Sequence, residues 1–225
     1  MSSSKPAKKV KTRIKDHELI DQRRRQIAEG AMKVFVAKGY HMATVREIAE
    51  AAGMTMGSMY NYVRSKEDII FFVYEHITHN LREEMKRAIE GITDPKERLR
   101  AALRHNLEAV EKHSDAIMFM YQSSGCLDRD SMHVVLGRET EYIKMFEELL
   151  RQSLGEQDYD EFRLRLAADI LAYLPVIITL RRWSLNRRFK STEEVMEGIM
   201  QFTMHGLDFF SLLAQPSGVA IPEKE

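Results

Sequence analysis

The chain has 225 residues, of which 44% are apolar, enough for a core in one large domain or in a small domain joined to a larger one. Its single cysteine excludes an internal disulfide and fits a reducing compartment, and its longest apolar run, residues 170–180, is shorter than the about 20 residues that span a bilayer. The net charge of zero conceals an asymmetry: residues 1–66 carry 14 of the 34 basic and 6 of the 34 acidic side chains, leaving 20 and 28 for residues 67–225. A polyanion such as nucleic acid is therefore expected to contact the first third of the chain.

The first 15 residues are rich in lysine and poor in apolar side chains, which predicts a flexible basic arm. Such an arm either stays a solvated tail or follows DNA phosphates, and DNA can order a tail that is disordered alone. No apolar segment follows it, so we expect no signal peptide and no membrane contact, and we predict a cytoplasmic protein.

Residues 16–38 predict a helix, because apolar residues recur at helical spacing from Ile20 to Phe35 and Gly39 supplies a stop. The three arginines at 23–25 project near its middle. They form either a solvated charged face or a set of phosphate contacts, and both readings stay open here.

Two short helical patterns flank Gly53 in the next stretch. Thr44 with Glu47 three residues on makes a capping box for the first pattern, and Thr55 precedes the second as its N-cap. Ser65 then begins a longer helix. Two short helices around a glycine are typical of a helix-turn-helix, whose second helix enters a major groove of DNA.

Helical spacing continues to the end of the chain, and strand-like alternation is scarce, so we predict an all-α fold. Ser114 is expected to cap the sixth helix, and Pro175 to kink or break the eighth at about residue 174. The nine predicted helices cover residues 16–38, 45–52, 56–63, 66–91, 95–112, 115–123, 128–154, 158–189 and 192–213.

Several spaced motifs stand together between residues 23 and 71: Gly39-Tyr40, Thr44-Val45-Arg46-Glu47-Ile48-Ala49, Ala52-Gly53-Met54-Thr55, Gly57-Ser58-Met59-Tyr60-Asn61-Tyr62 and Ser65-Lys66-Glu67-Asp68-Ile69. Together they resemble the N-terminal domain of the TetR family of bacterial transcriptional repressors. Val63 departs from the family pattern, which usually has phenylalanine there, but valine still fills an apolar site.

The resemblance implies an all-helical homodimer. Three N-terminal helices would bind DNA, a long fourth helix would connect, and the C-terminal domain would bind a small ligand and dimerise. Ligand binding would change the separation of the two recognition helices and release the operator. We therefore expect a basic arm over residues 1–15, a DNA-binding domain over 16–66, a ligand-binding and dimerisation domain over 67–214, and a loose tail over 215–225.

The resemblance also places the DNA contacts, and the side-chain chemistry agrees with it. Hydroxyls and free N–H groups at helix N-termini suit phosphates, amides and hydroxyls can read base edges, and a methionine can touch a thymine methyl. Tyr62 and Lys66 are the strongest candidates for phosphate contacts, although one of Tyr60 and Tyr62 is expected to pack between helices. The ten predicted contact residues are Thr44, Arg46, Thr55, Met56, Gly57, Ser58, Tyr60, Asn61, Tyr62 and Lys66.

The last two predicted helices carry more apolar side chains than an isolated hairpin needs, so we expect them to pair with a second copy in a four-helix bundle. We expect no catalytic activity, since Cys126 has no assigned base and no catalytic motif is present. We also expect no cofactor and no metal, because the closely spaced pairs His76 and His79, or His105 and Glu108, complete no ligand set.

The predicted effector site has an apolar wall and an anion-binding rim. The segment 180–190 contributes Arg182 and Arg187 to the rim, and the wall consists of Phe119, Tyr121, Met145, Tyr173, Ile177 and Trp183. The alternative for the wall is plain core, and the alternative for the rim is a solvated or interface face. A fatty acyl-coenzyme A, which some relatives sense, would match such a cleft. The competing functions are a repressor of an efflux system that senses apolar compounds, and a helical ligand-binding protein that no longer reads DNA.

Overall fold

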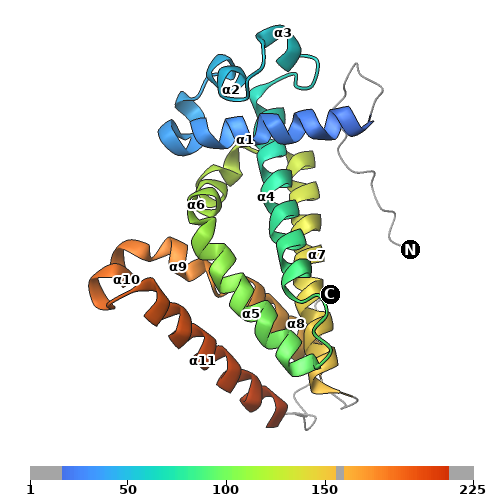
Figure 1. The fold of residues 1–225 in the computed structure, drawn as a ribbon, viewed down its shortest axis with the longest axis vertical. Coiled ribbons are helices and arrows are strands. Elements are labelled where there is room, and N and C mark those ends of the chain that lie inside the picture. The colour runs from blue at the N-terminus through green and yellow to red at the C-terminus, as the bar shows by residue number, and fades with distance from the viewer. Residues whose placement is uncertain (1–16, 156–159, 213–225) are drawn as a thin grey trace, which may run out of the picture. The chain divides into compact units, whose positions relative to one another are not determined.

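The computed structural model describes residues 17–155 and 160–212, with side chains up to residue 206. Within these ranges the chain forms eleven α-helices, one short 3₁₀ helix and no strand (Figure 1). The predicted all-α fold is confirmed. The count exceeds nine because one predicted helix is divided into three. The predicted arm (1–15) and tail (215–225) lie outside the described residues.

The N-terminal helices are α1 (His17–Met42), α2 (Val45–Ala51), α3 (Met56–Met59) and α4 (Lys66–Ala88). Helical geometry in α1 is interrupted at Gly39, with φ 77° and ψ 163°, where the glycine stop was predicted. The second short helix was predicted to run to residue 63, and this is wrong, since α3 ends at Met59.

Helices α5 (Pro95–Lys112), α6 (Ser114–Ser123) and α7 (Arg129–Leu154) follow, with the 3₁₀ helix η1 (Ser124–Cys126) before α7. Aspartates cap two of them: Asp94 Oδ1 accepts from the N–H of Glu97 at 2.8 Å, and Asp128 Oδ1 from that of Ser131 at 2.7 Å. The prediction that Ser114 caps α6 is wrong. Ser114 is already the first helical residue, and its side chain is buried.

The predicted eighth helix forms α8 (Glu161–Tyr173), α9 (Val176–Leu180) and α10 (Arg182–Arg188), followed by α11 (Thr192–Leu212). The break at Pro175 is as predicted. A second break at Arg181, where φ is −113° and ψ is 10°, was not predicted, because no glycine or proline marks it. The predicted start at residue 158 lies outside the described residues, and Asp160 Oδ1 caps α8 by accepting from the N–H of Phe162 at 2.8 Å.

Asn106 compensates for the proline. Pro175 has no N–H to donate to the carbonyl of Leu171, and Asn106 Nδ2 donates instead to the carbonyls of Leu171 and Ala172, both at 3.0 Å. The hydroxyl of Tyr142 completes the amide's bonding by donating to Asn106 Oδ1 at 3.0 Å. One buried amide thereby joins α5, α7 and the end of α8.

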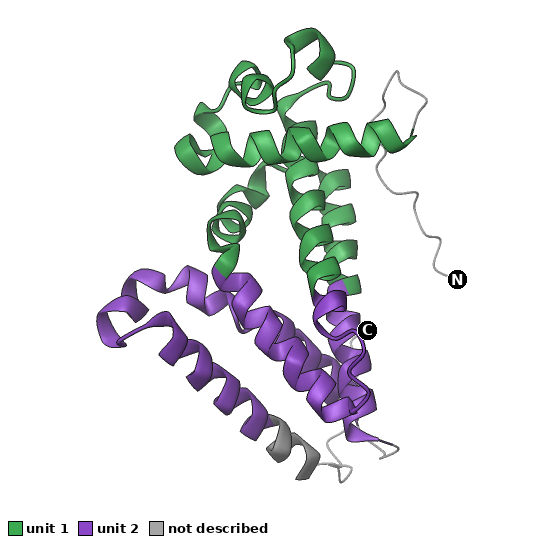
Figure 2. Ribbon diagram, in the orientation of Figure 1, with its two compact units in different colours: residues 1–84, 112–141 green, residues 85–111, 142–225 purple. Residues whose placement is uncertain are grey.

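The chain divides into two compact units (Figure 2). Unit 1 comprises residues 1–84 and 112–141, and its core gathers large apolar side chains such as Phe35, Ile48 and Ile70. Unit 2 comprises residues 85–111 and 142–225, with a separate core around Phe146 and Leu150. None of the described helices combines the length and the apolar character needed to cross a membrane. The functional boundary predicted at residue 66 stays a prediction.

Candidate nucleic-acid interface

The helix-turn-helix of unit 1 is positioned by a close approach of α1 and α2. A Cβ added to Gly30 would lie 2.6 Å from the backbone N of Ala52, so only glycine fits this crossing. Gln26 Nε2 donates to the carbonyl O of Ala52 at 2.6 Å, at the end of α2. Gly53 then reverses the chain with φ 64°. These contacts fix α2, and with it the turn that leads into α3.

The predicted capping box at the start of α2 is confirmed. Thr44 Oγ1 accepts from the N–H of Glu47 at 3.2 Å, and Glu47 Oε2 accepts from the N–H of Thr44 at 3.0 Å. Lys38 on α1 also binds the Glu47 carboxylate, and these hydrogen bonds, that of Lys38 being the largest cause, lower the pKa of Glu47 to about 2. Glu47 therefore connects α1 to the N-terminus of α2.

The predicted recognition helix α3 begins with Thr55, whose Oγ1 accepts from the N–H of Ser58 at 3.2 Å. After Met59 the chain tightens into i to i+3 bonds, since the N–H of Tyr62 bonds the carbonyl of Met59 at 2.9 Å. Met59, Tyr62 and Val63 are all buried in the core of unit 1. Directing these three side chains inward is the physical reason why the α-helix is shorter than predicted.

The predicted contact residues differ in exposure. Of the two tyrosines, Tyr62 packs between helices with 3% of its surface exposed, and Tyr60 is 53% exposed. The exposed members of the set are Thr44, Arg46, Thr55, Gly57 and Tyr60, and the half-buried ones are Met56, Ser58, Asn61 and Lys66. The exposed residues come from the starts of α2 and α3 and, for Tyr60, from the C-cap of α3.

Lys66 has structural partners of its own. Its Nζ donates to the carbonyls of His41 at 3.1 Å and Ala43 at 2.8 Å, and lies 4.4 Å from the centre of the Tyr40 ring. Burial, with the nearby Glu67 carboxylate second, raises the pKa of Tyr40 to about 12. Lys66 thus joins the start of α4 to the link between α1 and α2, and its predicted phosphate contact stays a prediction.

Two of the α1 arginines also contact neighbouring side chains. Arg23 Nη1 donates to Gln26 Oε1 at 2.7 Å, which orients the amide that bonds Ala52. The guanidinium of Arg24 lies 5.0 Å from the ring centre of Phe72 on α4. Arg25 is exposed. The first two arginines therefore support the packing of α1.

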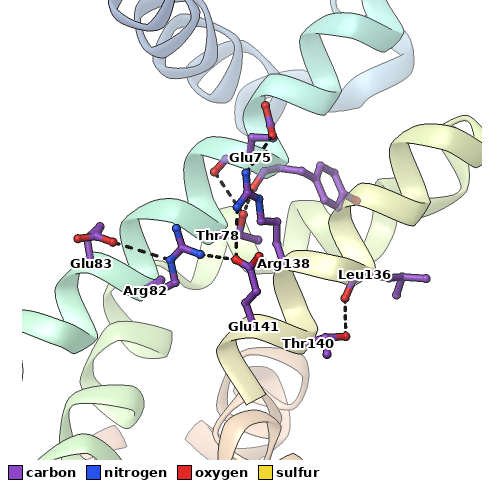
Figure 3. A network of polar contacts seen from close by, with 9 residues as sticks. Glu75, Thr78, Arg82, Glu83, Leu136, Arg138, Thr140 and Glu141 are labelled. Carbon is purple, nitrogen blue, oxygen red and sulfur yellow. Dashed lines mark hydrogen bonds and ion pairs between the residues drawn. The ribbon is translucent and has the colours of Figure 1, made fainter. Parts of the chain in front are cut away.

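A network of charged side chains joins α4 to α7 within unit 1 (Figure 3). Arg82 binds Glu141, whose carboxylate also accepts from Arg138 at 3.3 Å, and Arg138 lies 4.0 Å from Glu75. Burial raises the pKa of Glu75, although Arg138 opposes this. A cavity of about 480 Å³ beside this network is lined mainly by charged side chains, so it does not offer an apolar site.

Two family profiles match this sequence in succession. The profile described as bacterial regulatory proteins of the tetR family matches residues 27–71, and that of the tetracyclin repressor-like C-terminal domain matches residues 92–207, just over half of the chain. This protein belongs to the TetR family. It is 30% identical over 198 residues to the transcriptional regulator HbdR of Aromatoleum sp. (strain CIB), covering 86% of this chain and 85% of that one.

An activator and a solved complex with DNA are also similar to this TetR-family protein. The transcriptional activator FasR of Mycolicibacterium smegmatis is 28% identical over 85% of this chain and 86% of its own. The crystal structure of AibR in complex with isovaleryl coenzyme A and operator DNA superposes with a TM-score of 0.62 at 23% identity, over 80% of this chain and 97% of AibR. That similarity shows the fold.

The predicted ligand residues of this family member fall into both units. In unit 1, Phe119 is buried and stacks on Phe35 with ring centres 5.0 Å apart, and Tyr121 is half-exposed. In unit 2, Met145 and Tyr173 lie at the edge of the core, and Ile177 and Trp183 are exposed. Arg182 Nη2 donates to Glu111 at 2.9 Å, and Arg187 is exposed in the last turn of α10. This pocket stays a prediction.

Three residues outside the helix-turn-helix position it and were not predicted from the sequence: Gln26, Gly30 and Lys38. Gly30 carried a usable signal, because a glycine inside a strongly helical pattern often marks a close backbone approach. The partners of Gln26 and Lys38 lie 26 and 9 residues away and show no local pattern.

Within the described residues no group of three side chains could hold a metal ion.

Proposed function

We propose that this TetR-family transcriptional regulator is a repressor that binds a pseudo-palindromic operator as a homodimer. An amphipathic small molecule, of which a fatty acyl-coenzyme A is the class we favour, would release it. The observation that carries the proposal is the capped helix-turn-helix, whose exposed hydroxyl, guanidinium and phenol groups come from the N-termini of α2 and α3 and from the turn after α3.

The caps make this surface suitable for DNA. Thr44 and Thr55 hold the first turns of α2 and α3, where backbone N–H groups and the helix dipole favour a phosphate. Arg46 and Tyr60 are exposed beside them and can add a charge and a hydroxyl. Gly57 has no atom within 4 Å of an added Cβ, so α3 presents a bare backbone surface there. A base edge can approach such a surface closely.

Dimerisation is supported by apolar side chains that unit 2 leaves exposed. Phe162, Leu166 and Ile170 follow one another at four-residue spacing on α8, with 59%, 43% and 42% of their surfaces exposed. Phe202 on α11 is 75% exposed. A second copy would cover this apolar face, and the dimer would present two recognition helices to two half-sites.

The proposal of an anionic effector rests on charge in unit 2. Residues 180–190 carry five basic and no acidic side chains in an otherwise acidic part of the chain. Arg182 pairs with Glu111, whereas the side chains of Arg181, Arg187, Arg188 and Lys190 form no ion pair with a carboxylate among the described residues. The backbone N–H of Lys190 donates to Glu194 Oε2 at 2.8 Å. The relative AibR has been crystallised with isovaleryl coenzyme A, an acyl thioester that carries phosphates.

Three measurements on the full-length protein test this function. Binding to DNA of its own promoter region should appear at low salt and weaken steeply as salt rises, because phosphate contacts release counterions. Light scattering at micromolar concentration should give the mass of a dimer. Titration of the DNA complex with long-chain acyl-coenzyme A should release the DNA. Failure to bind promoter DNA at any salt concentration would contradict the proposal, as would a monomer.

A further inference from the structure

In unit 2, α5 and α11 border a groove of about 550 Å³ that the sequence reading did not foresee. One wall carries Lys96, Arg100 and Arg104 at four-residue spacing on α5. The other carries Glu197, Gln201 and His205 at the same spacing on α11. Side chains four residues apart share one face of a helix, so each wall is a continuous polar stripe.

The floor between these walls is apolar. It is lined by two largely buried leucines, Leu99 on α5 and Leu150 on α7, with Leu154 at the end of α7. Met200 and Met204 complete it from α11. Methionine side chains are flexible and polarisable, so they adapt to chains of different shape. A narrow apolar floor between two polar walls fits an extended hydrocarbon chain with a charged end.

The cations of this groove form only long or no ion pairs with carboxylates. Arg100 Nε lies 3.7 Å from Glu97 and Arg104 Nη2 lies 3.8 Å from Glu197, with all four side chains about half exposed. Lys96 has no carboxylate partner among the described residues. Glu97 and Glu197 also line the groove, so its three cations leave a net charge of one positive. Exposed pairs at such distances contribute little. A carboxylate or phosphate brought by a ligand would compete for the arginines and pair with Lys96.

We propose that this groove is the effector site, in which the floor takes the acyl chain of an amphipathic anion and the α5 cations meet its charged end. The inference rests on the effector class of the proposed function, and it assigns the charged end of the effector to the α5 cations instead of to residues 180–190. It differs from the pocket predicted from the sequence, none of whose residues lines the groove. A bound chain would hold α11 against α5, and α11 also carries the exposed Phe202 of the proposed dimer face.

The first test is a chain-length series on the full-length protein. Acyl-coenzyme A thioesters with 4 to 14 carbons are titrated against the complex with promoter DNA, and release is followed by fluorescence anisotropy. The concentration for half-release should fall by about fourfold per added methylene, the scale of apolar burial, until the floor is filled. Free fatty acids of equal length form the second arm, which separates a carboxylate end from the phosphates of coenzyme A.

The second test uses variants that alter the walls of the groove. Arg100→Glu with Arg104→Glu should raise the half-release concentration more than tenfold, since it replaces attraction by repulsion. Gln201→Trp, at an exposed wall position, should block long chains more than short ones. Arg165→Glu is the matched control, because Arg165 is an exposed arginine of α8 outside the groove. Arg187→Glu tests whether the arginines of α10 bind the effector instead.

The possible outcomes distinguish a wrong effector site from a wrong effector class. A weaker response to long-chain thioesters in both groove variants, with a normal response in Arg165→Glu and Arg187→Glu, supports the groove. A wild-type response in both groove variants, or loss of response in Arg187→Glu alone, would overturn the groove and leave the proposed function standing. If neither acyl thioesters nor fatty acids of any length release or stabilise the wild type, the proposed effector class fails and the groove proposal fails with it.

Discussion

Replacing Gly30 by alanine tests whether the crossing of α1 and α2 positions the DNA-binding helices. The added methyl carbon would lie 2.6 Å from the backbone N of Ala52 and 2.8 Å from its Cα and Cβ. These distances are far inside van der Waals contact. Two of the three atoms are backbone atoms, so no side chain can rotate away, and α1 and α2 must separate.

The expected magnitude follows from two opposing effects. Overpacking costs about 1–3 kcal/mol, and contact with rigid backbone places this site at the upper end. Alanine in place of glycine inside a helix returns up to about 1 kcal/mol. The net loss is about 2 kcal/mol, which corresponds to a decrease in Tm of roughly 4–8 °C for a chain of this size. Affinity for promoter DNA should fall as well, because α2 carries the turn that positions α3.

Gly137→Ala supplies the matched control. Gly137 lies inside α7 in the same unit, and an added Cβ meets nothing within 4 Å. The same substitution should therefore raise Tm there, by about 2–4 °C, and leave DNA affinity unchanged. Thermal unfolding at equal protein concentration, with anisotropy on promoter DNA, measures both effects. If Gly30→Ala is as stable as Gly137→Ala and binds DNA like the wild type, the crossing does not position the site.

Three further changes test individual contacts. Thr44→Ala removes the cap of α2 and should cost about 1 kcal/mol, or 2–4 °C in Tm; an unchanged Tm would show that the cap is dispensable. Lys66→Ala should weaken binding to every DNA sequence. If Lys66 contacts a phosphate, the slope of log affinity against log salt concentration should become smaller by about 0.9. An unchanged slope with a lower Tm would leave Lys66 only its structural role, the bonds to His41 and Ala43. Burial raises the pKa of Glu75 in the folded protein. The stability that the protonated Glu75 contributes is therefore fully present below the pKa of the unfolded state, about 4.5, and is lost as pH rises through the raised pKa of the folded state. Glu75→Gln should therefore raise Tm at pH 7 and leave it unchanged at pH 4, and a lower Tm at pH 7 would mean that the contact with Arg138 outweighs the desolvation.

Short sequence motifs predicted much of the N-terminal part of the fold, because the caps and turns that determine it join residues close together in the sequence. The capping box needs only Thr44 and Glu47 three residues apart, and the structure has both of its hydrogen bonds. Gly39, which was predicted as a helix stop, and Gly53, which was predicted to separate the two short helices, both have positive φ values. The competing roles of Tyr60 and Tyr62 could not be separated by spacing, since both lie in one tight turn. The structure separates them through the core that buries Tyr62.

The errors arise where a distant segment decides the local geometry. The segment 181–190 is helical in propensity and has no breaker, yet the helix is interrupted at Arg181. Pro175 was recognised as a break, but not Asn106, which lies 65 residues before Leu171 and satisfies the carbonyls exposed there. For Lys66 only a phosphate contact was predicted, and not the carbonyls 23 and 25 residues earlier in the chain that accept its protons. The partners of Leu171 and Lys66 are thus remote in sequence, and nothing local marks the break at Arg181.

The same reasoning explains why the helix-turn-helix could be located from the sequence and the proposed effector groove could not. A helix-turn-helix is a contiguous segment, so its motif residues recur at fixed spacing and can be matched as a group. The groove of unit 2 takes its cations from residues 96–104 and its floor from residues near 99, 150 and 200. On α5 alone, Lys96, Arg100 and Arg104 look like an ordinary solvated stripe, and the methionines of α11 look like plain core. Only the fold brings them together across α5, α7 and α11 in the proposed groove. The response to an effector, rather than DNA binding, is therefore the property that most directly tests the structure of unit 2.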